Sequence, residues 1–214
     1  MNRILLEHVS KIIQKNQILN DVNITLDSGY VYGFVGKNGS GKTMLFRTIS
    51  GLILPTEGTI TINTQVLHKD ISVVPNLGIL LENTGLYPEF TGFQNLKFLA
   101  KINKKIGTDE IRKAIVKVGL NPDDKRPIKK YSLGMRQRIL LAQAIMERPE
   151  YLLLDEPGNG LDESGLELMR TIINEEREKG TLILMASHSK EDIELLCDKV
   201  YNVNAGKIMG DSKK

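Results

Sequence analysis

Eight consecutive residues, GKNGSGKT at positions 36–43, carry the groups that hold a chain of phosphates. The run fills the pattern G-x-x-x-x-G-K-[S/T] and lies between an apolar, β-branched segment and a helical pattern. Glycine tolerates positive φ angles, so the backbone N–H groups of such a loop can converge on an anion. The ammonium group of Lys42 can bind the β- and γ-phosphates, and the hydroxyl of Thr43 can bind Mg²⁺. We therefore predict triphosphate binding by Gly36, Lys37, Asn38, Gly39, Ser40, Gly41, Lys42 and Thr43.

Two adjacent carboxylates end an apolar run later in the chain, in YLLLDEP at positions 151–157. A buried strand that stops here would place Asp155 beside the phosphate loop, where it can hold Mg²⁺ through water. Glu156 would then lie where it can orient or deprotonate an attacking water. Alone, Asp155 could simply cap a turn before Pro157, but the phosphate loop favours the metal interpretation. We expect phosphoryl transfer to water, because Glu156 follows the metal ligand directly; a kinase would need an acceptor site, and the sequence offers no candidate.

Ser132 and Gly134 lie in YSLGM, at the start of a long helical pattern. A hydroxyl and free backbone N–H groups at that position form a second potential anion site. Two copies of the chain could sandwich two nucleotides between such sites. The simpler interpretation is that Ser132 only caps its own helix. His188, which follows an apolar run, is similarly ambiguous, because a histidine there is usually packed and hydrogen-bonded.

Strand and helix patterns alternate along the chain and must position these residues. Helices are expected after Gly41, after a capping box formed by Thr91 and Gln94, from Thr108, from Glu163 and after Ser189. The alternation predicts an α/β fold with a mainly parallel sheet. We expect one domain over residues 1–214, with a helical insert at about 83–142. Strands are predicted at ILLEHV, VNITL, YVYGFV, TITI, ISVV, LGILL, YLLLDE and TLILMAS, and VYNVN with KIMG as a hairpin or edge pair.

The composition limits the possible partners. The 214 residues include 29 basic and 26 acidic side chains, and the resulting net charge of +3 is too small to indicate nucleic-acid binding. The single cysteine, Cys197, excludes an intrachain disulfide and fits a reducing compartment. No apolar run approaches the roughly 20 residues that span a bilayer. A role at a membrane would therefore require another chain to supply the spanning part.

In their order along the chain, these motifs resemble those of the nucleotide-binding subunits of ATP-binding cassette (ABC) transporters. GKNGSGKT resembles the family's Walker A loop, YSLGM its LSGGQ signature, and LLLDEP its Walker B strand. GNGLD at 158–162 is similar to the D-loop, and ASH is similar to the switch-histidine segment. The resemblance covers essentially the whole chain. It implies a P-loop NTPase core with an N-terminal antiparallel β portion and an inserted α-helical subdomain. It also implies catalytic roles for Lys42, Glu156 and His188, and a metal-binding role for Thr43 and Asp155.

The resemblance further implies cofactors and partners. The cofactors would be ATP and Mg²⁺. Two copies, or this chain and a related subunit, would pack head to tail, so that Ser132, Gly134 and Met135 of each face the nucleotide of the other. The driven partner would be an integral membrane permease, docked on the helical insert near Glu82 and LYPEFTG. The chain would then be cytoplasmic and peripheral on the inner face of the cell membrane. No nucleic-acid partner is expected.

Three features depart from the family pattern. Glu82 stands where a glutamine is usual; it could approach Mg²⁺ or the attacking water, but it adds negative charge near phosphate. Ile13 aligns with the aromatic residue that stacks on adenine, so we expect looser base selectivity, with GTP tolerated. Leu133 and Met135 replace glycine and glutamine in the signature, a form that resembles cassettes exporting peptides or protecting against antimicrobial peptides. We predict an ATPase subunit that dimerises on binding ATP and powers a permease, with export as the expected direction.

Three alternatives belong to other functional classes. A cassette ATPase of DNA repair or chromosome maintenance needs a long coiled-coil insertion, and no heptad run fits between Gly51 and Tyr131. A cassette protein acting on ribosomes usually carries two cassettes with a charged linker, whereas this chain carries one. A scaffold would bind nucleotide without cleaving it, and the intact pair Asp155–Glu156 argues against that use.

Overall fold

A computed structural model describes residues 2–81 and 85–213. Its larger sheet has six strands in the order β10-β9-β3-β8-β7-β6. All neighbouring pairs are parallel except β9 with β10, which confirms the predicted mainly parallel sheet and the terminal hairpin. The central strands are buried along their whole length, because helices or the second sheet cover both faces. The strands are β3 (Val31–Val35), β6 (Leu77–Leu80), β7 (Tyr151–Asp155), β8 (Leu182–Ala186), β9 (Lys199–Asn204) and β10 (Lys207–Lys213).

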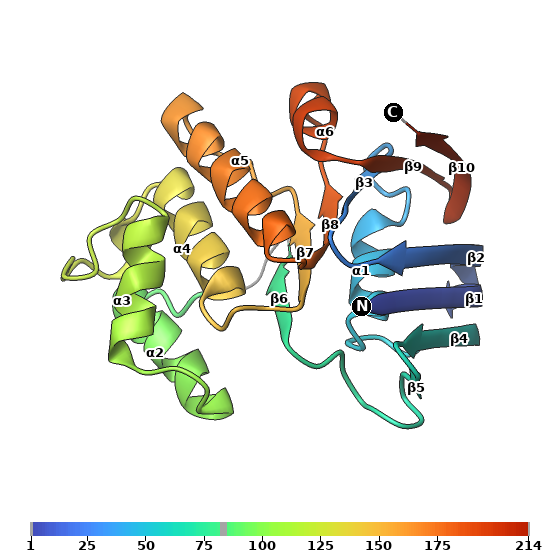
Figure 1. Cartoon of the computed structure of the whole chain (residues 1–214), viewed down its shortest axis with the longest axis horizontal. Coiled ribbons are helices and arrows are strands. Elements are labelled where there is room, and N and C mark those ends of the chain that lie inside the picture. The colour runs from blue at the N-terminus through green and yellow to red at the C-terminus, as the bar shows by residue number, and fades with distance from the viewer. Residues whose placement is uncertain (1, 82–84, 214) are drawn as a thin grey trace.

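The smaller sheet is antiparallel and has the strand order β2-β1-β4-β5. In β1 and β2 many buried apolar residues alternate with exposed polar ones, as expected for a sheet with one covered face. The sheet lies on the right in Figure 1, and helix α1 (Lys42–Ile49) fills the space between it and the parallel sheet. Within that core the rings of Phe34 and Phe46 meet edge to face, 5.4 Å apart. The strands are β1 (Arg3–Ile13), β2 (Asn16–Asp27), β4 (Glu57–Ile62) and β5 (Gln65–Val66).

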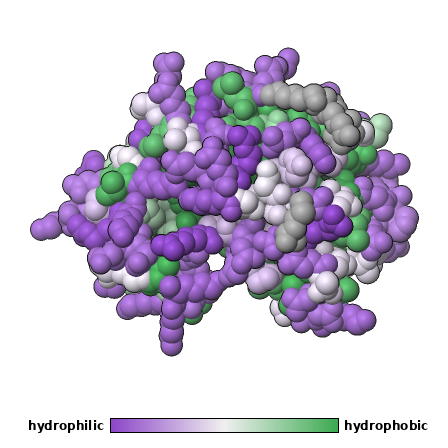
Figure 2. All heavy atoms as spheres, viewed as in Figure 1, coloured by the Kyte–Doolittle hydropathy of each residue, from purple (hydrophilic) through white to green (hydrophobic). Residues whose placement is uncertain are grey.

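Three helices between β6 and β7 gather at one end of the molecule, coloured green and yellow in Figure 1. They are α2 (Gly92–Asn103), α3 (Thr108–Lys117) and α4 (Leu133–Ile145), with a 3-10 turn at Ile128–Lys130. Helices α5 (Glu163–Glu178) and α6 (Lys190–Leu196) follow β7 and β8. The predicted inserted helical subdomain is therefore present. None of the helices in the described ranges is long and apolar enough to cross a membrane, and hydrophilic side chains cover most of the face seen in Figure 2.

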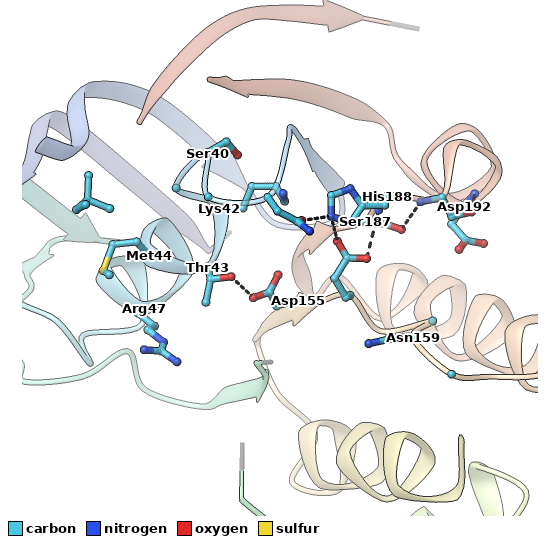
Figure 3. A pocket seen from close by; sticks show the side chains of 18 of the residues that line it. Ser40, Lys42, Thr43, Met44, Arg47, Asp155, Asn159, Ser187, His188 and Asp192 are labelled. Carbon is cyan, nitrogen blue, oxygen red and sulfur yellow. Dashed lines mark hydrogen bonds and ion pairs between the residues drawn. The ribbon is translucent and has the colours of Figure 1, made fainter. Parts of the chain in front are cut away.

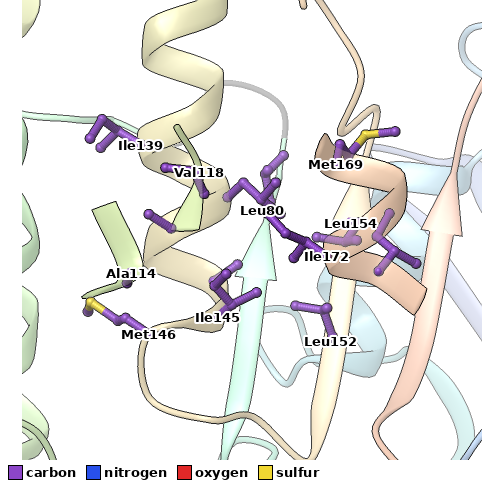
Figure 4. Close-up of a cluster of buried hydrophobic side chains, with 14 of the residues drawn as sticks. Leu80, Ala114, Val118, Ile139, Ile145, Met146, Leu152, Leu154, Met169 and Ile172 are labelled. Atoms are coloured by element: carbon purple, nitrogen blue, oxygen red, sulfur yellow. The ribbon is translucent and has the colours of Figure 1, made fainter. Parts of the chain in front are cut away.

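Helices α4 and α5 pack on the same face of the parallel sheet. Figure 4 shows Ile145 of α4 and Ile172 of α5 meeting Leu80 and Leu154 from the strands below them. These side chains are almost fully buried, and burying each one contributes about 1.5–3 kcal/mol to folding. This packing positions α4 relative to β7; the signature lies at the start of α4, and the paired carboxylates lie at the end of β7.

Local predictions of helix caps are confirmed, and one predicted strand is wrong. Thr91 and Gln94 form the reciprocal capping box at the start of α2, and the Ser189 hydroxyl accepts from the Asp192 N–H at the start of α6. The segment ISVV at 71–74 forms no strand. Only Ile71 makes an isolated bridge, to Leu67, because the Asp70 carboxylate accepts from the Val66 N–H and closes a turn there.

Candidate nucleotide site

The phosphate loop links β3 to α1 and has the backbone shape that the motif predicts. Gly39 and Gly41 adopt φ values of 77° and 114°. Gly36 has no room for a side chain, since a Cβ there would lie 2.2 Å from the carbonyl oxygen of Val203. The Ser40 hydroxyl is buried and makes no hydrogen bond to the described residues. The loop therefore forms a concave surface of backbone groups that only glycine-rich sequence permits.

Lys42 and Thr43 extend from the first turn of α1 to different partners. The Lys42 ammonium donates to the carbonyls of Gly36 and Lys37, at 2.8 and 3.3 Å, so it crosses the loop. The Thr43 hydroxyl donates to Asp155 Oδ2 at 2.5 Å. Asp155 ends β7 and is only 3% exposed, and Figure 3 shows it directed at Thr43. The hydroxyl and the carboxylate are hard oxygen donors, the type that Mg²⁺ binds.

Glu156 has an unusual backbone conformation and a perturbed carboxyl group. Its φ is 53°, in the left-handed region that non-glycine residues rarely adopt. One carboxylate oxygen accepts from the backbone N–H of His188 at 3.2 Å, and the other lies 3.3 Å from His188 Nε2. Burial is the main cause that raises the pKa of Glu156, and the nearby His188 opposes the shift. A raised pKa suits a carboxylate for taking a proton from water.

These groups line one pocket of about 940 Å³. The pocket brings together residues 38–43 of the phosphate loop with Asp155, Glu156 and His188, all predicted from the sequence. His188 lies between the loop and Glu156, because its Nε2 is 2.7 Å from Asn38 Oδ1 and 3.3 Å from a carboxylate oxygen of Glu156. The wall opposite the loop comes from the segment after β7, at Gly158, Asn159 and Gly160. The arrangement can hold phosphates, a divalent cation and an attacking water side by side.

Other predicted site residues do not line this pocket, among them Gly36 and Lys37 at the start of the loop. Ile13, at the end of β1, is 37% exposed and is not among the lining residues, whereas Ile18 of β2 is. Ser132, Gly134 and Met135 are at the start of α4 and do not line the pocket of their own chain. Glu82 lies outside the described residues.

Ser132 caps its own helix, as the simpler interpretation predicted. Its hydroxyl accepts from the Met135 N–H at 3.1 Å. Ser132 and Leu133 are both exposed at this helix end, and Leu133 is 54% exposed. Capping does not exclude a second role, because the remaining N–H groups of the first turn still point out of the helix end.

Sequence reasoning missed several lining residues. Met44 and Arg47 continue α1 beyond the motif, and Arg47 falls one helical turn after Thr43, a spacing that could have indicated it. Ile18 comes from the antiparallel sheet, and no local signal points to it. Ser187 and Asp192 flank the capped start of α6, and their place in the pocket follows only from the packing of that helix.

A glycine-rich loop between a strand and a helix, beside a buried aspartate and a half-buried glutamate at the end of a parallel strand, defines a P-loop nucleoside triphosphatase. Residues 19–159 match the ABC transporter family. The chain is 45% identical over 206 residues to an uncharacterised ABC transporter ATP-binding protein, YybJ of Bacillus subtilis, covering 96% of this chain and 94% of that one. It is 34% identical to the bacitracin transport ATP-binding protein BcrA of Enterococcus faecalis, over 95% of this chain and 67% of the relative. It is also 34% identical to the lantibiotic transport ATP-binding protein SrtF of Streptococcus pyogenes, over 95% and 88%.

Solved structures have the same fold. The dimeric structure of the ABC transporter cassette MJ0796 superposes with a TM-score of 0.87 at 21% identity, over 98% of each chain. The ATP-binding subunit of an ABC transporter superposes with a TM-score of 0.86 at 24% identity, over 98% of this chain and 89% of that one. The chain belongs to the ABC transporter family, as its ATP-binding and ATP-hydrolysing component, which confirms the resemblance noted in the motifs.

Proposed function

We propose that this ATPase works as one half of a head-to-tail pair that closes on two molecules of MgATP and drives a separate membrane permease. One observation carries the proposal. The pocket holds the phosphate loop, Asp155 and Glu156, while Ser132 is exposed at the start of α4, outside its own chain's pocket. A second chain, either a copy or a related subunit, can present that helix end to the open side of the nucleotide.

Within this pair, each residue of the pocket has a distinct task. Thr43 and Asp155 would hold Mg²⁺, and the cation would supply positive charge that offsets the charge of the phosphates. Lys42 supplies positive charge to the same phosphates. Glu156 orients or deprotonates the attacking water, and His188, next to Glu156, contacts the γ-phosphate. Ile13 is proposed as the contact to the base of the nucleotide. Ile18, unlike Ile13, is an apolar residue that lines the pocket.

The named relatives favour transport of peptide antibiotics over action on nucleic acid or ribosomes. BcrA and SrtF are bacitracin and lantibiotic transport proteins, and the chain resembles both along nearly its whole length. The form of the signature, SLGM, supports the same subclass. We therefore propose export of a peptide-like antimicrobial compound through a permease. The chain would be bound to that permease at the cytoplasmic face of the membrane.

The permease would dock on an aromatic cluster at the start of the helical segment. Tyr87, Phe90 and Phe98 are 60%, 37% and 39% exposed, and the rings of Phe90 and Phe98 are 4.9 Å apart. Exposed aromatic groups of this kind are typical anchors of protein interfaces. Asn95, which is buried, holds the segment in shape by accepting from the Tyr87 N–H and donating to the carbonyls of Tyr87 and Phe90.

The test combines catalysis with association. The full chain is purified alone and together with any polytopic membrane protein encoded beside it, and ATP turnover and co-purification are measured. We expect Mg²⁺-dependent ATP hydrolysis and a stable complex that Phe98→Asp weakens without changing the melting temperature. Stimulation of turnover by DNA, RNA or ribosomes, without any membrane partner, would contradict the proposal.

A further inference from the structure

Gln137 joins the signature helix to the catalytic glutamate of the same chain. It lies in α4, one turn and a half after the Ser132 cap, and is 9% exposed. Its side-chain amide donates to the backbone carbonyls of Glu156, at 2.9 Å, and Pro157, at 3.0 Å. Because both partners can only accept, both amide hydrogens are used at this junction. No other α4 side chain in the described structure donates to the backbone of residue 156.

The backbone of Glu156 needs such support. Its left-handed φ of 53° is unfavourable for a residue with a side chain, and such conformations persist only where the surroundings impose them. The Glu156 N–H donates to the Ala186 carbonyl on β8 at 2.9 Å. The Glu156 carbonyl accepts from Gln137 and from the Asn159 N–H at 3.1 Å. The peptide groups on both sides of Glu156 are therefore fixed. The backbone consequently sets the direction in which the Glu156 side chain points.

The rest of the signature helix is attached to the same segment. Arg138 Nη2 donates to the Asp162 carboxylate at 2.7 Å. Gly134 packs so closely on the loop after β7 that a Cβ there would lie 2.7 Å from the carbonyl oxygen of Gly160. The start of α4 and residues 156–162 consequently make contact at three places. A rigid shift of one would displace the other.

We propose that Gln137 is a positioning residue for the reaction. It holds Glu156 in its reactive orientation, and the position of the signature helix α4 determines that orientation through Gln137. The inference rests on the proposed function, in which Ser132 of that helix engages the partner's nucleotide. Closure on one nucleotide would then reach, through Gln137, the glutamate that acts on the other. Gln137 itself contacts neither nucleotide in this arrangement. A purely structural role, as a buried anchor between α4 and β7, is the alternative to be excluded.

The test replaces Gln137 by methionine, which keeps the length of the side chain and removes the donor. We expect kcat for ATP hydrolysis by the full chain to fall about 10- to 100-fold, the usual cost of a misplaced catalytic group, with KM and ATP affinity unchanged. Gln143→Met is the matched control, since Gln143 lies on the same helix and lines a separate cleft by β6. Gln137→Glu keeps the shape and presents an oxygen to the two carbonyls, and it should show the same loss.

A double-mutant cycle separates positioning from structure. If Gln137 acts through Glu156, adding Gln137→Met to Glu156→Gln should lower the residual turnover less than twofold, because the two losses share one cause. Independent, multiplying losses would overturn the proposal, as would unchanged kcat in both Gln137 variants. Failure of both variants to fold would assign Gln137 to stability alone and would also overturn it. Failure of the proposed function would appear differently, as full ATP turnover by an unmodified chain that never dimerises.

Discussion

Replacing Glu156 by glutamine removes one proton acceptor from the pocket and leaves its shape almost unchanged. Glutamine has the same length, and its remaining oxygen can still accept from the His188 N–H, as Glu156 does at 3.2 Å. What is lost is basicity, because an amide takes no proton at neutral pH. Losing a general base lowers turnover by about 10²- to 10⁴-fold, or about 3 to 5 kcal/mol in the barrier.

The assay measures steady-state ATP hydrolysis by the full chain, ATP affinity, and the mass of the protein with ATP and Mg²⁺. We expect affinity to stay within about twofold and the variant to accumulate as an ATP-bound dimer, because closure occurs and cleavage does not. Turnover equal to that of the unmodified chain would refute the assignment of Glu156 as the base. Full turnover by a protein that never dimerises would refute the shared site.

Protein stability provides the control for this variant. Burial raises the pKa of Glu156, so the folded state holds the proton more tightly than the unfolded chain does. The charged form therefore opposes folding, and this cost appears as pH rises above about 4.5 through the folded-state value. Without ligands, Glu156→Gln should match or exceed the unmodified chain in melting temperature at pH 7, and the difference should vanish near pH 4. A lower melting temperature at pH 7 would mean that lost activity reflects misfolding.

The remaining predictions concern the loop, the signature and the base. Lys42→Ala should weaken ATP binding about tenfold or more, measured by calorimetry, because Lys42 both holds the loop together and supplies charge; unchanged affinity would remove it from the site. Ser132→Arg should leave ATP binding intact but prevent dimerisation in the Glu156→Gln background, and Ser132→Asp, which keeps the helix cap, should do the same. A dimer that persists in both would limit Ser132 to capping. Competition assays should show GTP tolerated alongside ATP, since Ile13 offers no ring for stacking on the base; strict ATP preference would contradict this.

Local sequence determined the parts of this protein whose physics is local. The phosphate loop needs glycines at set positions. Each helix cap needs only one side chain that accepts a hydrogen bond from a backbone N–H three residues later, as at Thr91, Ser132 and Ser189. The paired acids at the end of an apolar run were identifiable for the same reason. The false strand at 71–74 shows the limit, because these apolar residues follow a turn and only Ile71 makes a bridge.

Only the tertiary structure decided which distant segments meet. Nothing near Gln137 in the sequence shows that its side-chain amide reaches the carbonyl of Glu156. Likewise, the sequence around Asn38 does not indicate that its Oδ1 lies 2.7 Å from Nε2 of His188. Ile18 enters the pocket from a different sheet, while Ile13, which the motif alignment favoured, does not line it. These contacts depend on how helices and sheets pack over long sequence separations, and packing is a property of the whole core that no single stretch of sequence contains.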